Sequence, residues 1–162
     1  MRFRSGRLIE EIEALYERDH ASYVRVARAI TGDRERAIEA VQEGFANALQ
    51  AQHTFRGDGS LKAWVWRIVV NAARAAARSP LVETPLNGVL RTETLPPVAE
   101  LASLIAALPE RQRHAVFLRY YADLDYRSIA EVLGIEIGTV SATLSAAHQA
   151  VRRSLLEVVP HD

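Results

Sequence analysis

Two apolar helical segments separated by one glycine restrict the fold of this chain more than any other feature. Residues 127–133 (RSIAEVL) place Ile129, Val132 and Leu133 on one helical face, and Gly134 follows them. Glycine enters the left-handed backbone region without a Cβ clash, so it commonly ends a helix. A longer amphipathic helix is predicted over 139–153, and its inward side chains are those of Val140, Leu144, Ala147 and Val151. A short helix, a glycine turn filled by Ile135 and Ile137, and a longer helix predict a helix-turn-helix, which presents one helix to a DNA major groove.

The first half of the chain is also predicted to be helical. Apolar residues recur at helical spacing in four successive segments before residue 79. The expected inward residues are Leu8, Ile12, Leu15 and Tyr16 in the first, Tyr23, Val26, Ala27 and Ile30 in the second, Ile38, Val41, Phe45 and Leu49 in the third, and Leu61, Trp64, Val65, Ile68 and Ala72 in the fourth. Asp33 and Ser60 are the expected N-caps of the third and fourth helices. The sequence has no alternating strand pattern, so the fold class is all-α.

A proline-rich segment divides the chain into two predicted domains. Residues 80–97 contain four of the six prolines and an Asn-Gly pair, a composition typical of a linker. We therefore expect one small domain over 1–79, a flexible linker over 80–97 that spans up to ~60 Å when extended, and a second small domain over 98–162. In the second domain, Leu108-Pro109 separates a first helix from a supporting helix over 111–121.

The charge balance is unusual for a protein that binds DNA by itself. The 20 basic and 20 acidic residues give a net charge of zero, although phosphate neutralisation supplies much of the affinity of DNA-binding proteins. Residues 1–79 carry 13 Lys or Arg against 10 Asp or Glu, residues 80–110 carry one against four, and residues 111–162 carry six of each. We expect a strong basic field to contribute little, and a partner to supply part of the affinity.

Composition argues against most other functions. The chain has no cysteine, which excludes disulfides and thiolate sites, and no apolar run approaches the ~20 residues that cross a membrane. The five histidines lack paired-ligand spacing, and Gly57-Asp58-Gly59 lacks the further carboxylates of a calcium loop. We expect a cytoplasmic, non-enzymatic protein with no catalytic residue, metal, cofactor, small-molecule substrate or membrane insertion.

The string FRGDGSLKAWVWRIVVNAAR, residues 55–74, is the most specific in the chain. It reads as a flexible turn with an aromatic ring and a cation, Phe55 and Arg56, followed by a helix in which Trp64 and Trp66 alternate with basic residues. Aromatic faces stack on bases and basic groups follow phosphates, so this pattern is typical of a surface for single-stranded nucleic acid. The residues alone leave open the alternative that both tryptophans are core, the arginines form a solvated face and GDGS is a capped turn.

This string resembles region 2 of the extracytoplasmic-function sigma factors of bacterial RNA polymerase. TGDRERAIEAVQEGF, residues 31–45, is similar to the same region, and LPERQRHAVFLRYY and DYRSIAEVLGIEIGTV are similar to region 4 of the family. The resemblance covers residues 8–155 in the family's order, with the linker in its expected place. It implies a sigma factor that binds core RNA polymerase and promoter DNA, directs promoter-specific initiation and is controlled by an anti-sigma factor.

The resemblance also implies roles for individual residues. The third helix would bind core polymerase through the outward side chains of Glu39, Gln42 and Glu43. The loop and the fourth helix would capture a flipped base of the melted −10 strand, at a cost that stacking offsets. The residues implied for −10 binding are Phe55, Arg56, Asp58, Ser60, Lys62, Arg67, Asn71 and Arg74. Trp64, on the inward stripe, is expected in the core. Gly44, which costs roughly 1 kcal/mol against alanine in a helix, suggests close approach of a partner or a neighbouring helix.

The second domain departs from the family in its recognition helix. Family members usually carry several Lys or Arg there, whereas GTVSATLSAAH, residues 138–148, has none, and the next is Arg152. An arginine bidentate to guanine is worth ~1–3 kcal/mol, so we expect affinity for the −35 element to be low and weakly dependent on salt. The residues that remain for −35 binding are Arg127, Thr139, Ser141, Thr143, Ser145, His148 and Gln149. The small side chains of Ala142, Ser145 and Ala146 would equally suit contact with a protein.

Two other functions remain open from the sequence. The chain could be a sigma-like interaction protein that binds polymerase or an anti-sigma factor without directing initiation, which the missing basic residues favour. It could also be a helix-turn-helix repressor that binds duplex DNA alone. The promoter consensus, the inducing signal, the identity of an anti-sigma factor and the arrangement of the two domains in the free state do not follow from the sequence.

Overall fold

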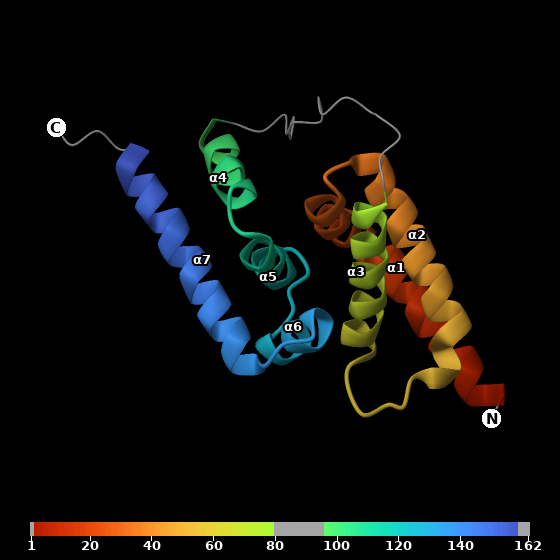
Figure 1. Ribbon diagram of the computed structural model, residues 1–162. Coiled ribbons are helices and arrows are strands. Elements are labelled where there is room, and N and C mark those ends of the chain that lie inside the picture. The colour runs from red at the N-terminus through yellow and green to blue at the C-terminus, as the bar shows by residue number, and fades with distance from the viewer. Residues whose placement is uncertain (1, 80–95, 159–162) are drawn as a thin grey trace.

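The chain folds into two groups of helices, and the predicted all-α class is confirmed. The computed structural model describes residues 2–79 and 96–158, and within these ranges it contains seven α-helices, one short 3-10 turn and no strand (Figure 1). The helices are α1 (Arg2–Thr31), α2 (Arg34–Ala51), α3 (Leu61–Arg78), α4 (Pro96–Ala106), α5 (Glu110–Tyr120), α6 (Tyr126–Leu133) and α7 (Ile137–Val158), with the 3-10 turn η1 (Gln52–Thr54) after α2.

The first domain is a three-helix bundle of α1, α2 and α3, with aromatic rings at its centre. The Tyr23 ring stacks on the Trp66 ring with centroids 3.8 Å apart, and Phe45 meets Tyr23 edge-on at 4.8 Å. Tyr23 and Trp66 are both fully buried. Aromatic side chains bury large apolar areas and gain further from such pairing, so this cluster fixes how the three helices pack.

One expectation about the first thirty residues is wrong, because the first two predicted helices are a single helix. α1 runs without a break from Arg2 to Thr31. The segment between the two apolar stripes, residues 17–22 (ERDHAS), holds neither glycine nor proline, so nothing in it interrupts the helix. The helix ends at Gly32, whose φ of 77° is the left-handed conformation that glycine adopts readily.

The predicted N-caps are confirmed. The Asp33 carboxylate accepts a hydrogen bond from the Arg36 backbone N–H at 3.0 Å, and the Ser60 hydroxyl accepts one from the Ala63 N–H at 3.3 Å. Each cap satisfies a backbone donor that the first turn of a helix leaves without a partner. These two residues therefore fix where α2 and α3 begin, and α3 is the helix on which the candidate site depends.

α3 is buried over a wider arc than its predicted apolar stripe. Val65 and Ala72 are buried as expected, whereas Leu61, Trp64 and Ile68 are half-buried at the edge of the core. The further buried residues are Ala63, Trp66, Val69, Val70 and Ala73. α3 packs on α1 and α2 and also on α6 of the second domain, so its apolar residues occupy more than one face.

The second domain contains the predicted helix-turn-helix. Gly134 ends α6 with φ 66°, and the Asp125 carboxylate caps its start by accepting a hydrogen bond from the Ser128 N–H at 2.8 Å. The inward side chains of α6 are buried as predicted, and so are Val140, Leu144 and Ala147 of α7. Ile135 packs against the core, but Ile137 is 48% exposed. The expectation that Ile137 fills the turn is therefore wrong, because α7 begins at this residue and directs it outward.

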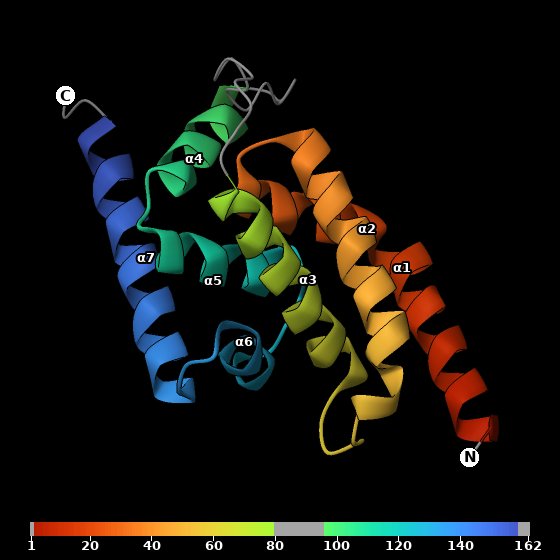
Figure 2. The ribbon, with the colours of Figure 1, turned by 45° about the vertical axis from the view of Figure 1, so that its right-hand side comes forward.

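The two domains lie against each other. α3 packs against α6 and α1 packs against α5, and Figures 1 and 2 both show α6 beside the end of α3 at which the loop arrives. α2 lies on the side of α3 away from α5, α6 and α7 (Figure 1). The predicted linker falls mostly on residues 80–95, outside the described residues, and α4 already begins at Pro96.

Within the described residues, no single helix has the length and apolar composition to cross a membrane. α6 and α7 meet those criteria when they are counted together, across a bend of 100°.

Candidate nucleic-acid interface

α3 carries four cations and no acidic residue. Arg67, Asn71, Arg74 and Arg78 follow each other at intervals of four, three and four residues, and this spacing places them on one helical face. Lys62 adds a fourth positive charge in the first turn. In the described part of the chain, no carboxylate oxygen lies within 4.0 Å of any of these cations. The face therefore keeps its positive charge available for phosphates.

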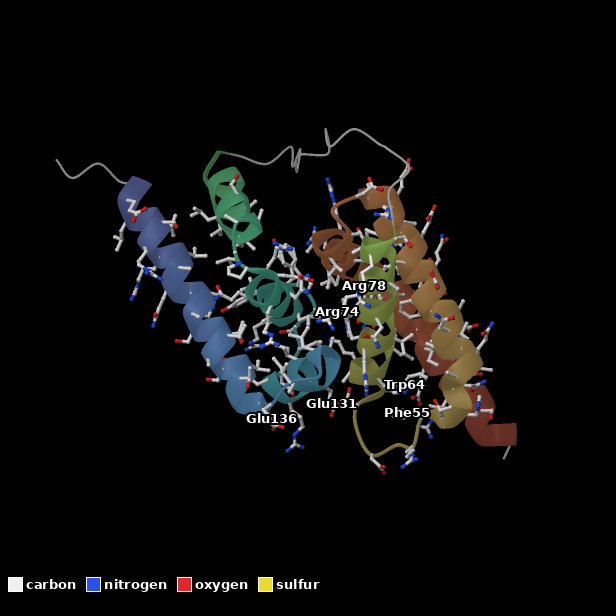
Figure 3. All side chains as sticks on the ribbon, viewed as in Figure 1. Phe55, Trp64, Arg74, Arg78, Glu131 and Glu136 are labelled. Atoms are coloured by element: carbon white, nitrogen blue, oxygen red, sulfur yellow. The ribbon has the colours of Figure 1, made fainter. Side chains whose placement is uncertain are left out.

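The loop before α3 brings an aromatic pair to the start of this face. The rings of Phe55 and Trp64 lie 5.5 Å apart at an interplanar angle of 54°, and both are half-buried. Figure 3 shows the two side chains near the end of α3 where the loop arrives. Gly57 has φ 83°, a conformation that lets the loop turn tightly between Phe55 and the cap at Ser60. Arg56 and Asp58 are exposed on this turn.

The two tryptophans of the motif have different environments. Trp66 is fully buried under Tyr23, so it belongs to the core and cannot stack on a base without unfolding the bundle. Trp64 packs against the core with part of its surface and keeps the rest at the edge of the loop. Of the aromatic residues in the string, the structure therefore leaves Phe55 and Trp64 for contact with a ligand.

A groove of about 490 Å³ lies between Arg67 of the cation face and the helix-turn-helix. Arg67 lines it from α3, and the other lining residues come from the second domain: Arg127, Ala130, Glu131, Gly134, Ile135, Glu136 and Ile137. Arg127, expected with the residues for −35 binding, lies in this groove instead of beside the outer face of α7. No local feature of the sequence indicates this placement, because it results from how the two domains pack.

A second groove, of about 400 Å³, runs along the outer face of α7. It is lined by Tyr126, Ser141, Leu144, Ser145, His148, Gln149 and Arg152. Four of the residues expected for −35 binding therefore come together: Ser141, Ser145, His148 and Gln149. Tyr126 and Arg152 were not among the expected residues. The helical spacing of Ser141, Ser145 and Arg152 places Arg152 on this face.

Two of the α7 residues expected for −35 binding, Thr143 and Thr139, are less exposed than the other residues expected for this contact. Thr143 is only 9% exposed and lies on the inward side of the helix, so it does not belong to the outer face as expected. Thr139 is half-buried. His148 is exposed but engaged, because its Nε2 and the Tyr120 hydroxyl are hydrogen-bonded at 2.8 Å. The groove along α7 is thus lined mostly by neutral groups, and Arg152 is the one arginine among its lining residues.

The outward face of α2 is acidic and polar. Glu39, Gln42 and Glu43 are all exposed, while Val41 and Phe45 on the opposite side are buried. Gly44 is explained by a neighbouring helix, since a Cβ at this position would lie 2.8 Å from the Val69 Cα of α3. The close packing of α2 against α3 therefore fixes the position of the exposed face of α2 relative to the cation face of α3.

A histidine of the second domain is buried, and its pKa is affected by an arginine of the cation face. His114 of α5 is 2% exposed, and its Nε2 has no hydrogen-bond partner among the described residues. Burial, with a smaller contribution from the charges of Arg113 and Arg74, lowers the pKa of His114 to about 4, although the charge of Glu110 acts in the opposite direction. Figure 3 shows Arg74 on the side of α3 that faces α5. The imidazole is therefore neutral at physiological pH.

Both domains match known families of protein. The model of Sigma-70 region 2 matches residues 15–79, and that of Sigma-70 region 4 matches residues 99–151. The RNA polymerase sigma-H factor of Pseudomonas aeruginosa is 30% identical over an alignment of 147 residues, which covers 76% of this chain and 75% of that protein. The ECF RNA polymerase sigma-E factor of Escherichia coli (strain K12) is 31% identical over 134 residues, covering 70% of each.

The fold is also that of two solved structures. CnrH in complex with the cytosolic domain of CnrY has a TM-score of 0.74 at 21% identity, covering 98% of both chains. The sigma factor RpoE in complex with the anti-sigma factor NepR from Bartonella quintana has a TM-score of 0.71 at 20% identity, covering 93% of this chain and 99% of that one. With such relatives spanning both domains, the chain belongs to the sigma-70 family as an extracytoplasmic-function sigma factor, a protein that directs transcription by RNA polymerase.

Proposed function

We propose that this sigma factor joins core RNA polymerase through the outward face of α2 and holds the melted −10 strand of a promoter against the 55–60 loop and α3. The observation that carries the proposal is the row of cations on α3, which has no acidic residue and begins beside the Phe55–Trp64 pair. A flexible single strand needs both kinds of group, because cations track its phosphates and aromatic rings stack on its bases.

Each group on this surface has a distinct role. Phe55 and Trp64 border the position for an unstacked base, and stacking is worth ~1–3 kcal/mol per base. Asn71 offers a side-chain amide that can pair with a base edge. Arg67, Arg74 and Arg78 attract the phosphates that follow. Ser60 uses its hydroxyl to cap α3, so it acts by fixing the loop.

The second domain contributes a weak contact to the −35 element. The groove along α7 offers hydroxyl, amide and imidazole groups and one cation, Arg152. Neutral groups of this kind can read base edges but release few counterions, so the contact is weakly dependent on salt. Most of the affinity for a promoter then comes from polymerase and from α3.

An anti-sigma factor and a cytoplasmic location complete the proposal. Both solved relatives were captured with a second protein, one of them named as an anti-sigma factor, and we extend this kind of partner to the present chain. Polymerase and promoters lie in the bacterial cytoplasm, so the chain acts there. It contributes binding energy and position, and polymerase performs the chemistry.

Transcription with purified components tests the proposal. Core polymerase and the chain are incubated with a promoter library, and transcript starts are mapped for the natural protein and for Arg67→Ala, Asn71→Ala and Arg7→Ala. We expect defined transcripts that fall fivefold or more with Arg67→Ala and Asn71→Ala, about 1 kcal/mol or more of lost contact. Arg7→Ala, at an exposed arginine of α1, serves as the matched control and leaves output unchanged.

Core binding is measured separately, by co-purification. Glu39→Lys and Glu43→Lys should weaken it, because they reverse the charge of the exposed face of α2. Failure of the natural chain to bind core polymerase would overturn the proposal. Binding without transcripts from any promoter would instead support a sigma-like interaction protein.

A further inference from the structure

A hydrogen bond on the surface of the second domain joins the end of α5 to the outer face of α7. The Tyr120 hydroxyl and Nε2 of His148 are hydrogen-bonded at 2.8 Å, and the centroids of the two rings lie 5.9 Å apart. Tyr120 is 60% exposed, and His148 is exposed as well. A hydrogen bond in water contributes little net free energy to folding, so the main consequence of this one is that it orients the imidazole.

The hydrogen bond leaves one ring nitrogen of His148 for a ligand. His148 lines the groove along α7, and its Nε2 is engaged by Tyr120. In the described parts of the chain, Nδ1 has no hydrogen-bond partner, and no carboxylate oxygen lies within 4.0 Å of the ring nitrogens. Nδ1 is therefore the polar atom of the ring that a ligand in the groove can use.

The partner at Nε2 decides what Nδ1 can do. A neutral imidazole has one N–H donor and one acceptor nitrogen, and the hydrogen bond at one nitrogen determines which of the two carries the proton. When the Tyr120 hydroxyl donates to Nε2, the proton of the neutral ring lies on Nδ1. The ring then offers a hydrogen-bond donor, which suits the oxygen of an anion.

The other side chains of this groove also favour an anion. Arg152 follows His148 by four residues, so the two side chains are neighbours on one helical face. Arg152 is exposed, and no carboxylate oxygen of the described residues lies within 4.0 Å of its guanidinium. Ser145 and Gln149 add further donors, and the lining residues include no Asp or Glu. Arginine binds phosphate strongly because its N–H groups match the geometry of the phosphate oxygens.

We propose that Tyr120 is a positioning residue for promoter binding, whose hydroxyl donates to Nε2 of His148 so that Nδ1–H and the Arg152 guanidinium together bind one phosphate of duplex DNA. This inference rests on the proposed −35 contact of the second domain, and it names the group on DNA that the contact holds. Phosphate contacts fix the register of a protein on DNA without reading its sequence. His148 therefore places α7 on the duplex and does not select a base.

The first measurement is the tautomer of His148 in the free chain, by nitrogen NMR of the imidazole at about pH 8.5, above the range in which histidine usually titrates. We expect the Nδ1–H form in the natural chain and a loss of this preference in Tyr120→Phe. Tyr121→Phe is the matched control, because it removes the hydroxyl of the adjacent exposed tyrosine, which has no hydrogen-bond partner among the described residues. The control should keep the Nδ1–H form.

The second measurement is the affinity of the free, full-length chain for two fluorescent DNA duplexes of unrelated sequence. Phosphate contacts do not depend on sequence, so neither polymerase nor a known promoter is needed. Tyr120→Phe should bind both duplexes roughly threefold more weakly than Tyr121→Phe does, and His148→Ala and Arg152→Ala should lose at least as much, because each removes or misplaces a donor to phosphate.

His148→Asn separates positioning from packing. The asparagine amide offers an N–H donor close to the place of Nδ1 and has no counterpart of Nε2, so its use does not depend on the Tyr120 hydroxyl. Adding Tyr120→Phe to His148→Asn should therefore cause no further loss of affinity. A purely structural role of Tyr120 predicts the same threefold loss in both backgrounds. Circular dichroism confirms that every variant keeps its helices.

The proposal is overturned if the tautomer or the duplex affinity of Tyr120→Phe equals that of Tyr121→Phe. A loss confined to one of the two duplexes would also overturn it, because it would assign His148 to a base edge. Failure of the proposed function shows instead as absent core binding or absent transcripts with the natural chain. Neither measurement of the Tyr120–His148 pair uses polymerase or a promoter, so the two failures are distinguishable.

Discussion

Gly44 is the residue at which packing and helix propensity oppose each other most clearly. A methyl group there would meet the Val69 backbone at 2.8 Å, and backbone cannot move away as a flexible side chain can. We expect Gly44→Ala to lower the free energy of unfolding by about 1–3 kcal/mol, the usual cost of overpacking, despite the better helix propensity of alanine. Urea unfolding followed by circular dichroism measures the change.

Gly6 supplies the matched control for this substitution. It lies in α1, and a Cβ at this position would meet nothing within 4 Å. Gly6→Ala should therefore stabilise the chain by up to about 1 kcal/mol through helix propensity alone. If both alanine variants are equally stable, or Gly44→Ala is the more stable, α2 and α3 do not approach as closely as described.

His114 should make stability depend on pH between about 4 and 6.5. Burial lowers the pKa of His114 to about 4, whereas in the unfolded chain it returns to the ordinary 6.5. Between these values the unfolded state binds more protons, so stability falls as pH falls and levels off below pH 4. The loss attributable to this residue reaches at most roughly 3 kcal/mol, since a tenfold difference in proton affinity corresponds to about 1.4 kcal/mol.

The measurement compares unfolding free energies of the natural chain and of His114→Leu over this pH range. The other titrating groups are common to both proteins, so the difference isolates His114. We expect the difference to shift in favour of His114→Leu as the pH drops. A constant difference would contradict a buried, neutral imidazole.

The sequence alone does not predict whether each single side chain is buried or exposed. Trp64 and Trp66 are two positions apart in one motif, and the string alone does not distinguish a core ring from a surface ring. Trp66 is buried because Tyr23, 43 positions earlier, stacks on it, and such a partner is set by tertiary packing. The burial of Thr143 also results from tertiary packing, and a hydroxyl side chain does not indicate from the sequence that its position faces inward.

Among the elements, α3 and α7 differ in how much of the promoter contact they should carry. α3 combines cations with an aromatic pair, whereas the groove along α7 is lined by hydroxyl, amide and imidazole groups and one arginine. We therefore expect Ser141→Ala to change promoter output less than Arg67→Ala or Asn71→Ala does. Transcription with purified core polymerase and each variant provides the measurement. An equal or larger loss with Ser141→Ala would show that the second domain reads the promoter strongly.

The boundaries of the elements were largely predictable, because their signals are local. Asp33 and Ser60 cap the helices that follow them, and Gly134 ends α6 in the left-handed conformation. The two apolar stripes of α1 predict two helices, and this prediction is wrong because no residue between the stripes interrupts the helix. An amphipathic stripe predicts burial against one neighbour only. It therefore underestimates the number of buried residues in α3, which packs against both its own domain and α6.

At the scale of the whole molecule, the sequence indicates two domains but not how they meet. Glu131 lies within a motif that reads as an ordinary helix of the second domain, and Gly59 lies within one that reads as a loop of the first. Their juxtaposition depends on two surfaces 72 positions apart in the chain, joined by a segment with no predicted helix. The zero net charge is in keeping with this contact, because the groove between the domains is lined by Glu131 and Glu136 together with Arg67 and Arg127.

The charges that line the groove between the two domains predict that the contact between the domains depends on salt. Arg67 lines this groove from α3, and Glu131 and Glu136 line it from the second domain together with Arg127. The screening length falls from about 10 Å at 0.1 M to about 3 Å at 1 M ionic strength, so the attraction of Glu131 and Glu136 for the α3 cations should weaken over this range. The chain has no cysteine, so spin labels attach specifically to cysteines placed at two exposed positions, Asn47→Cys on α2 and Leu156→Cys on α7. The distance between these labels should lengthen as sodium chloride is raised. It should depend less on salt in Glu131→Lys, because this variant lacks one of the attracting charges. The distance is the appropriate readout, because salt weakens strand binding directly. The Arg25 guanidinium of α1 also lies 5.5 Å from the centre of the Tyr121 ring. A label distance that stays unchanged at 1 M would assign the contact between the domains to this pair and to apolar packing, and the carboxylates would then have no part in it.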